Sequence, residues 1–213
     1  MTDDIVELGL SPSGRARRRL EQLSLAWRSC VDCALARSRQ HVVSYRGSPT
    51  APIALVGEAP GQEEDLRGVP FVGPSGRVVN DLLLEAKVSF DDVFFVNMVG
   101  CRPPADRAPS HEELLACESR ALDMLRTVEP IALIMFGVAA AKLAAVTSIG
   151  PWRGKPLRVE LGNGRSCRGV VTYHPSFLIR QGGDQRFRRR MLSDIKVARA
   201  IAHKDSRNAL LRR

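Results

Sequence analysis

The sequence predicts an α/β fold in which helices cover both faces of a mostly parallel sheet. Short apolar segments, typical of buried strands, alternate with longer segments of helical spacing. This alternation favours parallel strands, because a parallel pair needs a long crossover connection, usually a helix. Polar residues also follow the apolar segments, and ligands of such folds bind beyond the carboxyl ends of the strands.

Four short apolar segments are the predicted main strands: residues 53–56, 93–96, 131–136 and 169–173. They are rich in branched and aromatic residues, which is the pattern of strands buried on both faces. Pro52 and Gly57 bound the first, and Gly137 ends the third. Before the fourth, the Asn-Gly pair within residues 162–164 suits a tight turn and predicts a hairpin.

Five segments are the predicted helices: residues 14–28, 75–87, 110–127, 138–146 and 184–203. The first is rich in arginine and carries leucines at helical spacing, and the second places apolar residues at helical intervals. The third begins with a capping box, in which Ser110 accepts from a backbone N–H and Glu113 reaches back. The fourth is short and rich in alanine, and the last is basic.

The size and the N-terminus restrict the organisation of the chain. Its 213 residues, 44% of them hydrophobic, suffice for one sizeable core and are short for two. We expect one domain over residues 1–213, with a helical extension at 1–26 and a basic tail at 204–213. The acidic start differs from a secretory signal, and no apolar run has the length of a membrane span. We therefore expect a cytoplasmic protein that does not contact membranes.

The charge of the chain favours nucleic acid as its partner. The net charge of +9 comes from 32 Lys and Arg against 23 Asp and Glu, and arginine dominates the excess. Arginine suits phosphate groups, and the basic C-terminal segment could follow a phosphate backbone. A solvated basic face is the alternative interpretation of that segment.

Four cysteines form the candidate metal site: Cys30, Cys33, Cys101 and Cys117. In a reducing compartment, a Cys-x-x-Cys pair indicates a metal or redox element rather than a disulfide. Four thiolates suit either an iron–sulfur cluster or a tetrahedral zinc, and the spacing leaves both open. For Cys167, we expect a buried position as a small hydrophobic side chain.

Residues that are unusual for a core follow each predicted main strand. Residues 58–65 follow the first, Asn97 and Cys101 follow the second, Gly137 ends the third, and His174 follows the fourth. Core packing explains four such strand ends less well than a shared binding site does. The sequence therefore predicts an enzyme with its site at this edge of the sheet.

Several motifs carry a specific resemblance: Gly-Glu-Ala-Pro-Gly at 57–61, Glu64-Asp65, the glycine-flanked segment 68–73, Ser75-Gly76, Asn97, Cys-Arg-Pro-Pro at 101–104 and His-Pro-Ser at 174–176. In this order, over about residues 27–200, the chain resembles the family 4 uracil-DNA glycosylases. The resemblance implies a three-layer α/β/α sandwich around a four-stranded parallel sheet. It also implies a structural [4Fe–4S] cluster on the four cysteines.

The resemblance further implies a monofunctional DNA glycosylase that hydrolyses the bond between uracil and deoxyribose and leaves an abasic site. Its substrate would be double- or single-stranded DNA containing uracil, and we expect it to act as a monomer. The alternative is a module of the same fold that binds nucleic acid without cleaving it.

The chemistry of excision assigns roles to the pocket residues. Uracil must leave the base stack, and negative charge then builds on the departing base. By resemblance, Phe71 packs on the uracil ring. Asn97 has both a donor and an acceptor, so it can pair with uracil and disfavour cytosine. His174 can donate a hydrogen bond to the uracil O2 as the charge develops.

Carboxylates are the candidates for holding or activating the water. We assign that role to Glu64, and place Glu58 near the base and the backbone N–H groups of Ala59 and Gly61 in the pocket wall. Many family members have asparagine where this chain has Asp106. Since a carboxylate there could act as a general base, Asp106 is a second candidate.

The segment after His174 is the candidate DNA contact. Phe177 or Leu178 would enter the duplex as an apolar wedge, and Arg180 would touch phosphate. The alternative is that these apolar residues begin a core helix.

Overall fold

The computed structural model describes the backbone of residues 10–210 and the side chains of residues 10–204. Residues 1–9 of the predicted extension and 211–213 of the predicted tail lie outside the described residues, as do the side chains from residue 205 on. The division into one domain with two extensions stays a prediction.

The fold contains a six-stranded sheet with the strand order β1-β3-β2-β4-β6-β5. Its strands are β1 (Tyr45–Gly47), β2 (Ile53–Gly57), β3 (Val93–Asn97), β4 (Ala132–Phe136), β5 (Pro156–Gly162) and β6 (Arg165–Thr172). The four central strands are parallel, and the edge strands β1 and β5 run antiparallel to their neighbours. The α/β class is confirmed, but the sheet has two more strands than the four that the resemblance implied.

The two edge strands differ from the central ones in their burial. All five residues of β2, β3 and β4 are buried, which explains their continuous apolar sequences. In contrast, β1 has only three residues, none of them buried, and therefore lacks an apolar run. Strand β5 alternates between exposed and buried residues and forms the predicted hairpin with β6, with Asn163 and Gly164 in the left-handed conformation that a tight turn requires.

Helices connect and cover the strands: α2 (Pro12–Trp27), α3 (Gln62–Arg67), α4 (Pro74–Glu85), α5 (His111–Val128), α6 (Gly137–Ala141), α7 (Pro175–Arg180) and α8 (Gln185–Leu210). Short 3₁₀ helices are η1 (Ala34–Arg37), η2 (Phe90–Asp92), η3 (Pro104–Asp106) and η4 (Lys142–Ala144). The capping box of α5 is confirmed, with Glu113 N–H donating to Ser110 Oγ at 3.2 Å and Ser110 N–H to Glu113 Oε2 at 2.7 Å.

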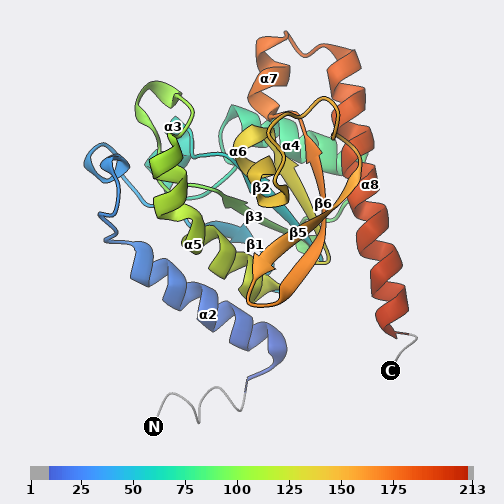
Figure 1. Ribbon diagram of the computed structural model, residues 1–213, viewed down its shortest axis with the longest axis horizontal. Coiled ribbons are helices and arrows are strands. Elements are labelled where there is room, and N and C mark those ends of the chain that lie inside the picture. The colour runs from blue at the N-terminus through green and yellow to red at the C-terminus, as the bar shows by residue number, and fades with distance from the viewer. Residues whose placement is uncertain (1–9, 211–213) are drawn as a thin grey trace.

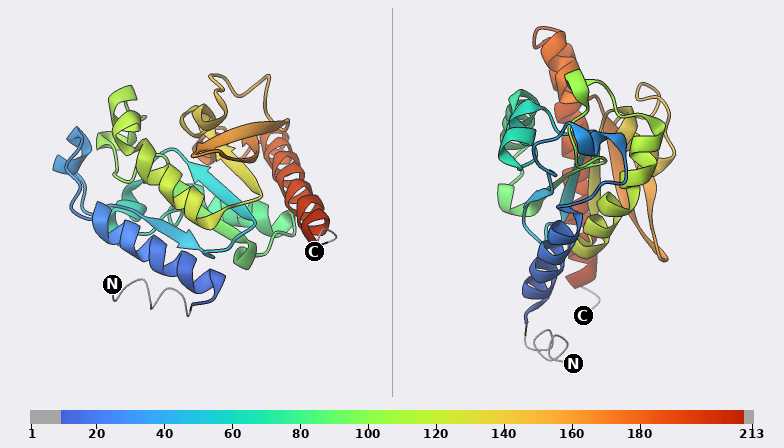
Figure 2. Two further views of the ribbon diagram at one scale, coloured as in Figure 1. Left: turned by 60° about the horizontal axis from the view of Figure 1, so that its bottom comes forward. Right: turned by 90° about the vertical axis from the view of Figure 1, so that its left-hand side faces the viewer.

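Helices lie on both faces of the sheet (Figures 1 and 2), and two hydrophobic clusters lie on its opposite faces. On one face, alternate residues of β2, Ala54 and Val56, share one hydrophobic cluster with residues of α2 and α5. On the other, the intervening residues, Ile53 and Leu55, share a second cluster with residues of α4 and α8. The three-layer arrangement is therefore the predicted one. In the described part of the chain, no helix combines the length and apolarity needed to cross a membrane.

Candidate active site

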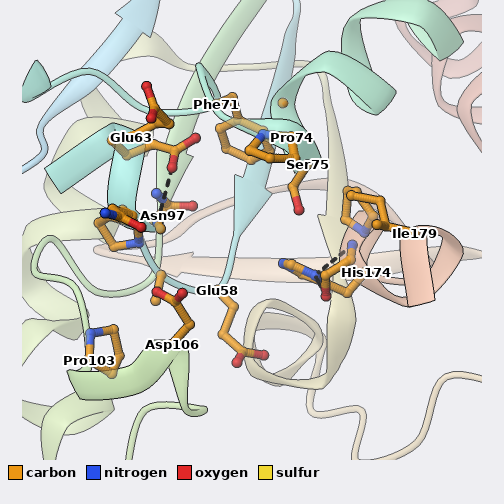
Figure 3. A pocket seen from close by; sticks show the side chains of 18 of the residues that line it. Glu58, Glu63, Phe71, Pro74, Ser75, Asn97, Pro103, Asp106, His174 and Ile179 are labelled. Atoms are coloured by element: carbon orange, nitrogen blue, oxygen red, sulfur yellow. Dashed lines mark hydrogen bonds between the residues drawn. The ribbon is translucent and has the colours of Figure 1, made fainter. Parts of the chain in front are cut away.

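A pocket of about 670 Å³ lies where the parallel strands end (Figure 3). Its walls come from the loop after β2 with the start of α3, from Phe71 and the start of α4, from the end of β3, from η3, and from α7. Nine of the predicted site residues line it: Glu58, Ala59, Gly61, Glu64, Phe71, Asn97, Asp106, His174 and Arg180. The topology thus gathers residues that are more than a hundred positions apart in sequence.

Asn97 occupies the last position of β3, opposite Gly57 of β2. The residue is buried, and no described residue is hydrogen-bonded to its carboxamide, although the residue lines the pocket. A Cβ atom on Gly57 would collide with Asn97 Oδ1 and lie 2.8 Å from Phe71 Cζ. Glycine at position 57 therefore makes room for both side chains, and the Asn97 amide is left for a ligand.

Phe71 forms an apolar wall with its backbone in the left-handed region, at φ 58°. Its ring contacts Phe95 and Phe136 at centroid distances of 5.4 and 6.2 Å. A Cβ atom on Gly76 would collide with the Phe71 carbonyl oxygen, so α4 also requires a glycine at this contact. A non-glycine residue persists in this conformation only where its surroundings fix it, which makes the ring a rigid face of the pocket.

His174 precedes α7 and is held by its own helix. The backbone N–H of Ser176 donates to Nδ1 at 3.2 Å, and the Ser176 hydroxyl lies 2.7 Å from the same atom. Burial and, to a smaller extent, the nearby positive charge of Arg180 together lower the pKa of His174 to about 4. The ring is therefore neutral at pH 7 with Nδ1 as acceptor, which leaves its proton on Nε2 as a donor.

Glu58 lies in the pocket wall beside Gly137, as does His174. A Cβ atom built on Gly137 would lie 3.6 Å from Glu58 Oε2 and 3.2 Å from His174 Cβ, so both side chains flank this glycine. Among the described residues, none is hydrogen-bonded to the Glu58 carboxylate. Burial raises its pKa, and the positive charges of Arg180 and Lys142 act in the opposite direction.

Glu64 differs from Glu58 because its carboxylate is bound by the backbone. Oε1 accepts from the N–H groups of Val72 and Gly73 at 2.9 and 2.7 Å, and Oε2 accepts from Gly61 N–H at 3.1 Å. These bonds join the loop after β2 to the loop before α4. They also occupy the Gly61 N–H, which we expected to be part of the pocket wall. The geometry is that of a carboxylate that fixes two loops.

Asp106 lies at the rim of the pocket in η3. Its side chain is 56% exposed and forms an ion pair with Arg102, whose Nε lies 2.7 Å from Asp106 Oδ1. The preceding Ala105 and Asp106 itself both have positive φ angles, 54° and 53°. An exposed, paired carboxylate is less suited to act as a general base than a buried one with a raised pKa.

The four cysteines of the candidate metal site lie at the end of α2, after β3 and within α5. Electrostatic interactions link Cys30 to Cys117, and Cys101 to both Cys33 and Cys117. Two of the sulfurs receive donors: Gly100 N–H to Cys117 Sγ at 3.3 Å, and Arg39 Nη1 to Cys101 Sγ at 3.7 Å. Such donors suit thiolate ligands. Among the described residues, however, no group of three or more Cys, His, Asp or Glu side chains is close enough together to hold a metal ion.

Comparison with known proteins identifies the family. Residues 45–196 match the uracil DNA glycosylase superfamily. The chain belongs to the uracil-DNA glycosylase superfamily. A type-4 uracil-DNA glycosylase of Thermotoga maritima is 33% identical over 192 residues, 87% of this chain and 96% of the relative. Those of Archaeoglobus fulgidus and Saccharolobus solfataricus are 32% and 35% identical over 71% and 70% of this chain, which cover 78% and 72% of those relatives. The predicted resemblance is therefore confirmed.

In this superfamily member, α7 places its apolar residues differently from the predicted wedge. Leu178 is only 3% exposed and belongs to the core, as the alternative interpretation had it. The Phe177 ring contacts the rings of Tyr173 and Phe187, with centroid distances of 5.3 and 4.8 Å. Ile179, which sequence reasoning missed, is 43% exposed and lines the pocket. A helical reading of residues 175–180 could have found it, since Leu178 and Ile179 then point in different directions.

Proposed function

We propose that this protein removes uracil from DNA by hydrolysing the bond between the base and deoxyribose, leaving an abasic site. The observation that carries the proposal is that three side chains share one pocket. Asn97 provides an unpaired amide, Phe71 an apolar ring, and His174 a neutral N–H donor. The names of the relatives, type-4 uracil-DNA glycosylases, point to the same reaction.

Recognition of the base follows from two of these side chains. A uracil that leaves the duplex stacks on Phe71, while the Asn97 carboxamide pairs with one carbonyl and the imide N–H. Cytosine presents the reversed donor and acceptor pattern, so binding it would leave buried polar groups unpaired. No described residue is hydrogen-bonded to the Asn97 carboxamide, so it is available to pair with uracil and thereby discriminates between the two bases.

Cleavage of the bond leaves negative charge on uracil, and His174 stabilises it. Its Nε2–H donates to the uracil O2, while Ser176 holds Nδ1 and thereby fixes the tautomer. A donor of this kind typically contributes about 10²–10³ in rate.

We assign the activation of water to Glu58 in place of Glu64. The burial that raises the Glu58 pKa brings it closer to neutral pH, as a general base requires, and its oxygens are available to a water. Glu64 instead positions Ala59 and Gly61 by binding the loops on both sides of the pocket. Asp106, with one oxygen paired to Arg102, remains the second candidate base.

The four cysteines, we propose, hold a [4Fe–4S] cluster. The chemistry of four thiols, with hydrogen-bond donors to Cys101 and Cys117, suits such a group. Bound there, it would tie the end of α2 to α5 and to the loop after β3, a structural role. Zinc is the alternative, and broad absorbance near ~400 nm distinguishes the cluster from it.

DNA lies across the mouth of the pocket in this proposal, and the protein acts as a monomer on double- or single-stranded substrate. Ile179, at the rim, takes the place of the extruded base, and Arg180 contacts phosphate. Arg180 is exposed and is held by the Ser176 hydroxyl at 2.9 Å.

The test incubates purified protein with single- and double-stranded oligonucleotides that carry one uracil, with thymine and cytosine oligonucleotides as controls. Release of free uracil and an alkali-labile site, without added metal or nucleotide, supports the proposal. Protein that binds these oligonucleotides and shows the absorbance near ~400 nm, but releases no uracil, would instead be a binding module without excision activity.

A further inference from the structure

Arg120 is a buried cation for which the proposed chemistry has no use. It projects from α5 into the core and is 1% exposed. No carboxylate of the described residues forms an ion pair with it, and its Nε atom has no hydrogen-bond partner. The buried Asp194, by contrast, is paired with Arg153 at 2.8 Å. Burying an unpaired guanidinium is costly, so the position of Arg120 needs an explanation.

The strongest contact of Arg120 is with the residue that reads the base. Arg120 Nη2 donates to the backbone carbonyl of Asn97 at 2.5 Å, and Nη1 lies 3.5 Å from the carbonyl of Val43. Beyond Asn97 the chain leaves the sheet, with Met98 N–H donating to Gly57 O at 2.9 Å and Val99 N–H to Glu58 O at 3.1 Å. The guanidinium therefore fixes the backbone of Asn97, the last residue of β3, which carries the carboxamide side chain.

A glycine next to the cysteines makes room for this contact. A Cβ atom on Gly100 would lie 2.9 Å from Arg120 Nε and 3.1 Å from Cζ. Gly100 directly precedes Cys101, and its N–H donates to Cys117 Sγ at 3.3 Å. Cys117 lies about one helical turn before Arg120 on α5. Arg120 thus lies between the cysteines and the floor of the pocket.

We infer that Arg120 is a positioning residue for excision, which fixes the Asn97 carboxamide through the Asn97 carbonyl. The inference rests on the proposed function and extends it. Arg120 does not touch the base and acts on it through Asn97. Its loss therefore slows the chemical step on bound DNA and leaves DNA affinity unchanged.

The experiment measures single-turnover uracil excision, DNA affinity and absorbance near ~400 nm for wild-type protein and Arg120→Ala. A hydrogen bond from a charged group typically accounts for about 10- to 100-fold. We expect a rate loss of that size at saturating protein, with unchanged DNA affinity and absorbance. Added guanidinium ion at millimolar concentration should restore part of the rate, because the substitution leaves a cavity of its shape.

Arg126 provides a matched control on the same helix. Its Nε donates to the backbone carbonyl of Leu161 at 2.5 Å, and it does not line the pocket. Arg126→Ala should lower the melting temperature, as Arg120→Ala does, yet leave the excision rate unchanged and unresponsive to guanidinium. Should Arg120→Ala not fold, Gly100→Ala tests the same contact, because the added methyl group displaces the guanidinium and should slow excision.

The outcomes separate this inference from the proposed function. Wild-type protein that releases no uracil would overturn both. If wild-type protein excises uracil, a full rate for Arg120→Ala, an equal loss for Arg126→Ala, or no response to guanidinium would overturn the role of Arg120 alone. A full rate for Gly100→Ala would do the same where Arg120→Ala does not fold.

Discussion

Replacing Glu64 with glutamine should destabilise the protein, whereas the same change at Glu58 should not. The Glu64 carboxylate accepts three backbone N–H groups, two at Oε1 and one at Oε2. Glutamine keeps one oxygen, which can still accept from Val72 and Gly73, but it turns an NH₂ group toward the Gly61 N–H. Leaving this part-buried donor unpaired costs up to about 1–3 kcal/mol, the cost for a fully buried one. For a chain of this size, that corresponds to a decrease in melting temperature of roughly 2–12 °C.

The matched substitution, Glu58→Gln, removes no hydrogen bond among the described residues. Burial already disfavours the Glu58 charge, so a neutral side chain of the same shape should change stability by less than about 0.5 kcal/mol. If Glu58 activates the water, excision should fall by about 10²–10⁴. The two variants thus separate a carboxylate that acts on the reaction from one that fixes the loops.

Thermal unfolding and single-turnover excision of both variants test this reasoning, with DNA affinity as the control. We expect Glu64→Gln to melt earlier, and Glu58→Gln to melt like wild type but excise slowly. If the Glu64→Gln protein has wild-type stability but excises no uracil, Glu64 rather than Glu58 activates the water. A full rate for Glu58→Gln would refute our assignment and leave Asp106 as the base.

Four further predictions follow from the same contacts. Asn97→Asp, which loses the donor, should slow uracil excision by about 10- to 100-fold in single-turnover assays. The free energy of unfolding, measured in urea, should fall as the pH drops from 6.5 toward 4. The cause is that His174 binds a proton near pH 6.5 in the unfolded chain but only near pH 4 in the folded one. His174→Gln should weaken this dependence of stability on pH. Ile179→Ala should slow excision from duplex DNA by roughly 10-fold and leave single-stranded substrate unaffected. Cys101→Ala should abolish absorbance near ~400 nm and lower the melting temperature.

The sequence predicts the centre of the fold better than its edges for a physical reason. Strands buried on both faces, such as β2 and β3, must be apolar throughout, and that pattern is visible without a structure. Strand β1 is three residues long with no buried residue, and it exists because it pairs with β3. Helix α3, also missed, spans six residues of the acidic motif, and its Glu64 binds the more distant N–H groups of Val72 and Gly73 besides capping the helix at Gly61. Both elements depend on tertiary contacts rather than on local preference.

The location of the site was predictable from topology, but the roles of its carboxylates were not. Parallel strands bring their carboxyl ends to one edge, so Glu58, Asn97 and His174 had to lie near one another. Glu58 and Glu64 have the same side chain, and only their partners distinguish them. Arg120 gave no signal at all in the sequence, because an arginine on a helix is ordinarily exposed.

The rigidity of the pocket and the neutrality of its donors, Asn97 and His174, have a common consequence for catalysis. Phe71, Asn97 and His174 are each held by the backbone or by a neighbour, through the contacts of Gly76, Arg120 and Ser176. A donor that is already oriented costs no reorganisation when charge develops on the base, and it acts more strongly where water is excluded. A protonated His174 would be a stronger donor, but burial disfavours its charge, and the positive charge of Arg180 disfavours it further. The site therefore favours release of a uracil anion through fixed neutral donors, which makes the geometry around Asn97 the property on which its selectivity depends.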